Sequence, residues 1–87
     1  MKADALLEHA AGIVTRRRRE YGDPTLLFEQ IARRWSLTLG IDVSPAQAVA
    51  CMIDVKLARL AQDPKHSDSV TDIAGYAGCL AEVLHDD

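Results

Sequence analysis

The sequence predicts an all-α fold, a compact arrangement of four helices within a single domain formed by residues 1–87. Apolar residues recur at helical spacing in four successive segments, and no segment alternates apolar and polar residues as a half-buried strand does. Short breaks that contain glycine or proline separate the segments, and short connections favour helices that pack as antiparallel neighbours. At 87 residues, of which 48% are apolar and 26% charged, the chain has the size and composition of one small globular domain.

The first two helices are expected on either side of the turn Tyr21-Gly22-Asp23-Pro24. Gly22 suits a left-handed helix end, Asp23 is a favourable N-cap, and Pro24 fits the first position of the next helix. The second helix is expected to stop at Gly40. The apolar stripes are Leu6, Leu7, Ala10, Ile13 and Val14 in the first helix and Leu27, Phe28, Ile31, Trp35 and Leu39 in the second.

The third and fourth helices are bounded by equally clear signals. Ser44 can cap the third helix, and Gln47, three residues later, can complete a capping box. This helix is expected to run to about Ala61, and residues 63–64 separate it from a fourth helix that begins near residues 67–68. The apolar residues are Val49, Cys51, Met52, Ile53, Val55, Leu57 and Leu60 in the third helix and Ile73, Tyr76, Ala77, Leu80, Val83 and Leu84, facing inward, in the fourth.

The third helix is apolar on nearly every side. A helix without a polar face lies either at the centre of a fold or beneath a partner chain. The pattern therefore favours a partner surface on this helix, covered either by a second copy of the chain or by another protein.

Composition excludes several classes of protein. Cys51 and Cys79 fall within apolar helical patterns and are interpreted as small buried side chains, and no Cys/His spacing suits a structural zinc site. Without a signal peptide or an apolar run of about 18–20 residues, we expect a cytoplasmic protein with no membrane contact. The net charge is −3, and four of the ten basic residues form the run 16–19, interpreted as a solvated helix end. Binding of nucleic acid is disfavoured because no aromatic residues interleave these arginines.

Two cations and two carboxylates are expected to lie side by side between the last two helices. On a helical projection Lys56 and Arg59 share one flank of the third helix, and Asp68 and Asp72 are neighbours on the fourth. Ionised groups beside a core are costly unless they are paired or used for binding. Three interpretations stay open: an ion-pair network that locks the two helices together, cations that bind a phosphate-bearing ligand, and a magnesium site formed by Asp68 and Asp72.

Three further residues complete the candidate ligand-binding set. Tyr21 can present its ring for base stacking and Arg19 can contact a phosphate, although the same turn can also be only a well-formed corner between helices. His66 lies in the loop beside the charged residues, where a histidine is often solvated or caps a helix.

Three motifs carry a resemblance to a known family. The chain contains R-x-x-x-Y-G-D ending at Asp23, K-x-x-R-L from Lys56 to Leu60, and D-S-x-x-D-x-A-G-Y from Asp68 to Tyr76. In this combination, which spans nearly the whole chain, it resembles a family of small phage and prophage proteins of uncharacterised function.

That family in turn looks like a distant relative of the all-α nucleoside triphosphate pyrophosphohydrolases of the MazG type. Those proteins are helical bundles, usually dimeric or tetrameric, in which an E-E-x-x-E helix and an E-x-x-D helix hold magnesium around a nucleotide's phosphates. The resemblance implies that Asp72 matches the last aspartate of this pattern. Lys56 and Arg59, however, stand where acidic ligands are expected.

The departure limits the chemistry that the resemblance implies. Magnesium-assisted hydrolysis needs carboxylates around the metal, and cations in those positions remove most of them. The resemblance therefore implies a nucleotide- or phosphate-binding protein of MazG-like fold that is a weak or inactive pyrophosphohydrolase. It also implies a homo-oligomer, expected as a homodimer. The alternative is a non-enzymatic helical scaffold that binds or inhibits a host protein.

Overall fold

The computed structural model describes residues 1–85 and contains four helices within them. They are α1 (Ala3–Tyr21), α2 (Pro24–Leu39), α3 (Pro45–Gln62) and α4 (Ser67–His85). No strand is present in this part of the chain, so the all-α prediction with four helices is confirmed.

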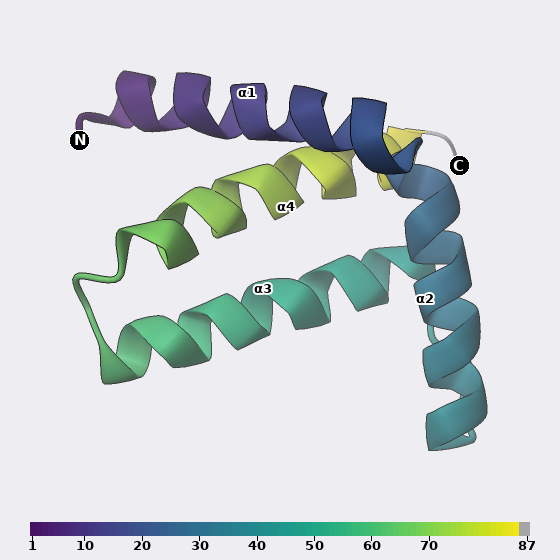
Figure 1. The fold of residues 1–87 in the computed structure, drawn as a ribbon. Coiled ribbons are helices and arrows are strands. Elements are labelled where there is room, and N and C mark those ends of the chain that lie inside the picture. Colours follow the sequence, from purple (N-terminus) through teal and green to yellow (C-terminus); the bar gives the residue numbers. More distant parts are fainter. Residues whose placement is uncertain (86–87) are drawn as a thin grey trace.

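Three of the helices form a layer and the remaining one crosses its end. α4 lies between α1 and α3, and α2 runs across one end of these helices (Figure 1). α3 and α4 are antiparallel neighbours, as their short connection predicts. α2, by contrast, turns steeply away from α1 after a connection of only two residues, Gly22 and Asp23. The result is an open corner bounded by α1, α2 and α3 rather than a regular antiparallel bundle.

The predicted helix boundaries are confirmed at both proline-containing starts. Gly22 has a positive φ of 87°, and the Asp23 carboxylate accepts a hydrogen bond of 2.9 Å from the Thr25 backbone N–H. At the start of α3, the Ser44 hydroxyl accepts from the Gln47 N–H at 3.1 Å, and the Gln47 side chain accepts from the Ser44 N–H at 2.9 Å. These contacts satisfy N–H groups that the helices cannot bond internally.

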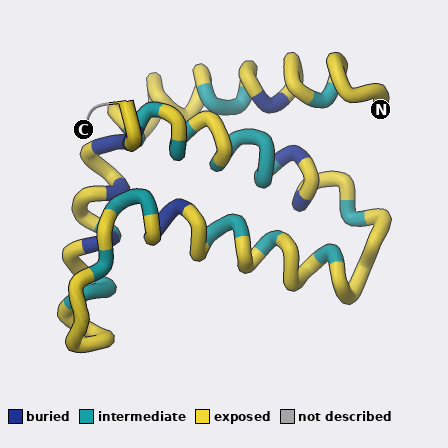
Figure 2. The backbone as a smooth tube through the Cα atoms, turned by 180° about the vertical axis from the view of Figure 1, so that it is seen from behind, coloured by how far each residue is buried: buried dark blue, intermediate teal, exposed yellow. Residues whose placement is uncertain are grey.

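The core is small and lies where α2 crosses α3 and α4. The fully enclosed cluster consists of Phe28, Ala32, Ala48, Val49 and Val83. Figure 2 shows that exposed positions alternate with intermediate or buried ones along the helices, and that much of the outer side of α2 and α3 is uncovered. None of the helices within residues 1–85 is both long and apolar enough to span a membrane.

Several residues expected in the core are exposed. The expectation that Cys51 is buried is wrong, and Cys79 is only half-buried. The reason is geometric: α2 and α4 cover a single side of α3. Apolar residues elsewhere around this helix, including Val55 (48% exposed) and Leu57 (51% exposed), therefore stay in contact with solvent. Other predicted core residues that are exposed are Leu7, Leu27, Leu39, Ala77 and Leu84.

Candidate functional site

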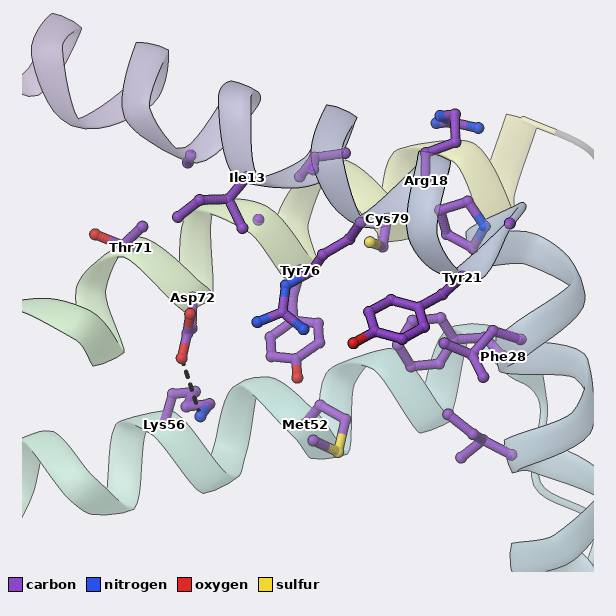
Figure 3. A pocket seen from close by; sticks show the side chains of 18 residues that line it. Ile13, Arg18, Tyr21, Phe28, Met52, Lys56, Thr71, Asp72, Tyr76 and Cys79 are labelled. Atoms are coloured by element: carbon purple, nitrogen blue, oxygen red, sulfur yellow. Dashed lines mark ion pairs between the residues drawn. The ribbon is translucent and has the colours of Figure 1, made fainter.

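A pocket of about 410 Å³ opens in the corner between the four helices (Figure 3). It exists because α1 packs along α4 and leaves the space toward α3 unfilled, while α2 closes one end. Most of its wall is apolar. The apolar and small lining residues are Ala10, Ile13, Val14, Gly22, Pro24, Leu27, Phe28, Ile31, Met52, Thr71, Gly75 and Cys79.

Aromatic rings form one end of this pocket. Tyr21, the last residue of α1, and Phe28 of α2 lie together at this end, and Tyr76 of α4 stands nearer the middle (Figure 3). The Phe28 and Tyr76 rings meet edge to face, with centroids 6.3 Å apart and an interplanar angle of 80°. Phe28 is buried, whereas the Tyr21 ring is 71% exposed and therefore free to contact a ligand.

An ion pair forms the opposite end. Lys56 Nζ of α3 lies 3.0 Å from Asp72 Oδ2 of α4, and both side chains line the pocket. Their exposed fractions are 18% and 35%, so the pair is only partly shielded from water. A pair of this kind contributes about 1 kcal/mol or less to stability. The pair therefore joins two helices, as the ion-pair interpretation expects, and it also faces an open cavity.

Two arginines of α1 also line the pocket, and the sequence had suggested only a solvated run. Arg18 points away from the interior (Figure 3). It forms an ion pair with Glu82 of α4. Arg17 has no ion-pair partner among residues 1–85. It lies four residues after Ile13 and four before Tyr21, which places all three on one side of α1. Arg17 is thus a lining cation whose charge no carboxylate within residues 1–85 neutralises.

A cysteine separates the aromatic wall from the Arg18–Glu82 pair. Burial raises the pKa of the Cys79 thiol above its ordinary value, the nearby Glu82 carboxylate acts in the same direction, and Arg18 opposes them. A raised pKa keeps the sulfur protonated near neutral pH, and a protonated thiol is a poor nucleophile. Cys79 thus contributes a half-buried side chain to the pocket wall.

Four residues of the predicted site do not line the pocket: Arg59, Asp68, Arg19 and His66. Arg59 and Asp68 are exposed and lie beyond its ionic end, in the last turn of α3 and the first turn of α4. Arg19 is exposed and, two residues after Arg17, points to another side of α1. The predicted cluster of four charges is therefore reduced to Lys56 and Asp72 in the pocket, with Tyr21 at its far end.

His66 has a structural role next to this region. Its Nδ1 accepts a hydrogen bond of 3.2 Å from the Ser69 backbone N–H and lies 2.7 Å from the Ser69 hydroxyl. An imidazole nitrogen thus takes the place of the side-chain oxygen that usually caps a helix. The cap holds Ser69, which is fully buried, at the start of α4.

Replacing His66 with alanine is expected to lower the free energy of unfolding by about 1 kcal/mol, the typical loss for a removed N-cap. His66→Asn should recover most of this loss, because asparagine caps helices well. Urea unfolding followed by circular dichroism measures both values. Equal losses in the two variants would mean that the imidazole does more than cap the helix.

Arg59→Ala is expected to change the free energy of unfolding by no more than about 0.5 kcal/mol, because the side chain is exposed and unpaired within residues 1–85. Lys56→Ala, by contrast, removes the partner of Asp72. The same unfolding experiment compares them. A larger loss for Arg59→Ala than for Lys56→Ala would contradict the pairing described above.

Fold and pocket together define a small helical protein with an apolar cavity that is aromatic at one end and ionic at the other. The chain belongs to the family described as Domain of unknown function (DUF6378), whose profile matches residues 5–84. It is 34% identical over 85 residues to the Gene 55 protein of Mycobacterium phage D29, covering 97% of this chain and 56% of that protein. It is 38% identical over 68 residues to the Gene 55 protein of Mycobacterium phage L5, covering 77% of this chain and 44% of that protein.

The expected kinship with phage proteins is confirmed by these relatives. The chain spans about half the length of the curated relatives that it matches. No solved structure is significantly similar to it.

Proposed function

We propose that this protein binds a nucleotide, or a closely similar phosphate-bearing aromatic compound, in the pocket between its helices. The observation that carries the proposal is the placement of Tyr21 and Tyr76 in the same apolar pocket as Lys56 and Arg17. Aromatic rings stack on nucleobases without strong sequence preference, and charge-assisted hydrogen bonds from lysine or arginine hold phosphates. The volume of about 410 Å³ falls in the range of small-molecule sites.

The three motifs of the family resemblance support the same pocket. The first places Tyr21 in its wall, the second places Lys56 there, and the third supplies Asp72, Gly75 and Tyr76. Residues from three separate motifs thus converge on one cavity. A purely structural role would not require them to share an open space.

We further propose that the fold is MazG-like and that any pyrophosphohydrolase activity is weak or lost. Asp72, which matches the last aspartate of the MazG pattern, faces the pocket, but Asp68 does not. Within residues 1–85 no group of three or more histidine, cysteine, aspartate or glutamate side chains could hold a metal ion. Magnesium prefers several oxygen ligands in octahedral geometry. It would therefore have to enter with the phosphates of the ligand, as a weakly held cofactor.

Binding is tested by thermal unfolding of the full chain in the presence of nucleoside mono-, di- and triphosphates, each with magnesium and with a chelator. A ligand at one hundred times its dissociation constant stabilises the folded state by about 2.7 kcal/mol, which raises Tm of a domain this small by about 10 °C or more. An unchanged Tm with every nucleotide would contradict the proposal and favour the interaction scaffold.

A second proposal concerns the uncovered apolar surface, which we assign to a second copy of the chain. The accessible surface is 6293 Å², whereas a monomer of 9.5 kDa is expected to expose about 5,000 Å². The radius of gyration is 13.6 Å, against about 12 Å for a compact chain of this length. The excess area is larger than the roughly 800 Å² that each partner contributes to a standard interface.

The outer side of α3 is the part of this surface that a dimer would cover. Cys51, Val55 and Ala58 are exposed there at spacings of four and three residues, which puts them on one side of the helix. Sedimentation equilibrium should give a mass twice the 9.5 kDa of one chain. The Val55→Lys variant should give the mass of a single chain. A monomer at all concentrations would instead favour a host protein as the partner of this surface.

A further inference from the structure

The charges around the pocket limit which phosphate-bearing ligand it can hold. Of the three cations in its wall, Lys56 is paired with Asp72 and Arg18 with Glu82. Arg17 is the lining cation that has no ion-pair partner within residues 1–85. The wall therefore presents one uncompensated positive charge, that of Arg17. Lys56 carries a second positive charge, which can interact with a bound phosphate as well as with Asp72.

This balance suits a single phosphate group. A phosphate monoester carries about −1.5 to −2 charge near pH 7, with three strong acceptor oxygens. A guanidinium such as that of Arg17 can bind two phosphate oxygens at once, and an ammonium such as that of Lys56 can act on a phosphate as a point charge. Two more phosphates would add negative charge beside Asp72. Within the described residues, no group of side chains could hold a metal ion that compensates this charge.

The two ends of the pocket also differ in chemistry. Along its length, the Lys56–Asp72 pair is followed by Tyr76 and then by Tyr21 with Phe28 (Figure 3). The hydroxyls of both tyrosines point into the space between the helices (Figure 3), where they can hydrogen-bond to a base or a sugar. A phosphate at the ionic end would thus place an attached base among the rings.

We infer that the pocket selects nucleoside monophosphates and binds them without a divalent metal ion. This inference rests on the proposed function and narrows it to one substrate class. It makes Arg17 the residue that distinguishes a phosphorylated ligand from a neutral nucleoside, and the tyrosines the residues that distinguish a nucleotide from a sugar phosphate.

The test is isothermal titration calorimetry of the full chain with five probes, each in a chelator and in excess magnesium. The probes are adenosine, ribose 5-phosphate, and the mono-, di- and triphosphates of adenosine; a second series uses thymidine compounds. The monophosphate should bind at least tenfold more tightly than the nucleoside, the sugar phosphate or the triphosphate, and magnesium should change its affinity less than twofold.

Each other outcome is decisive. Tighter binding of a triphosphate that depends on magnesium would overturn the inference while leaving the proposed nucleotide site intact. Equal binding of ribose 5-phosphate and the monophosphate would overturn the role of the rings. Absence of binding by every phosphorylated probe would overturn both the inference and the proposed function.

Neighbouring arginines provide matched variants for the same titration. Arg17→Gln should weaken monophosphate binding at least tenfold and leave adenosine binding unchanged. Arg16→Gln makes the same chemical change one residue away, outside the pocket wall, and should stay within twofold of the parent. Equal losses in the two variants would mean that the arginine run attracts anions nonspecifically, which contradicts the inference. Circular dichroism verifies that both variants remain folded.

Discussion

Phe28→Ala is expected to lower the free energy of unfolding by about 3–4 kcal/mol, because it removes a buried aromatic ring. Phe28 is 3% exposed, lies in the small core where α2 meets α3 and α4, and packs edge to face against Tyr76. Removing the ring leaves a cavity and also removes a wall of the pocket. Because a domain of this size has a total stability of only about 4–13 kcal/mol, much of it would be lost.

The loss is measured by urea unfolding followed by circular dichroism, with Leu26→Ala as the control. Leu26 lies two residues away on the same helix, but 59% of it is exposed, so its truncation should cost no more than about 1 kcal/mol. A loss for Phe28→Ala as small as that of the control would show that the core does not lie where α2 crosses the other helices.

Lys56→Glu is expected to weaken nucleotide binding at least a hundredfold. The substitution removes the cation that faces the pocket and places a carboxylate next to Asp72, which lies 3.0 Å from the lysine nitrogen. Both the lost attraction and the new repulsion act on a bound phosphate. A hundredfold change in affinity corresponds to about 2.7 kcal/mol of binding free energy. The lost attraction and the new repulsion together can supply this amount in a partly shielded site.

Arg59→Glu is the matched control for this experiment. It reverses the same charge on the same helix, three residues further on, but outside the pocket wall. Titration calorimetry should give an affinity within threefold of the parent protein. Equal weakening by the two substitutions would indicate long-range electrostatics in place of a defined site, and unchanged binding in Lys56→Glu would remove Lys56 from the site.

Local signals in the sequence were sufficient to predict the helices. Pro24 and Pro45 each follow a residue whose side chain caps the helix, and Gly22 and Gly40 both adopt positive φ. These boundaries depend on interactions between residues close in the chain, which a single sequence displays directly. The steep crossing of α2 depends instead on which side chains meet across helices, and no local signal fixes it.

The site was predicted only in part for the same reason. A helical projection placed Lys56 and Asp72 on facing flanks, and their ion pair has formed. The projection could not show that Arg59 and Asp68 lie beyond the end of the pocket, because that end is set by the packing of α1 on α4. It also gave no sign that α2 and α4 would leave Cys51 exposed.

Arg17 is the residue of the pocket wall that the sequence could have revealed. The R-x-x-x-Y-G-D motif that ends at Asp23 begins at Arg17. The spacing of four residues from Arg17 to Tyr21 puts both on one side of α1. Treating residues 16–19 as a uniform solvated run concealed this spacing.

The most direct test of the central claim is a nuclear magnetic resonance titration of the isotope-labelled chain with a nucleoside monophosphate. If the pocket binds the nucleotide, backbone amide signals should shift at residues of its wall, above all Arg17, Tyr21, Lys56 and Gly75, and remain in place at Leu37 and Arg59. Absence of any saturable shift, or shifts confined to residues outside the pocket, would contradict the account.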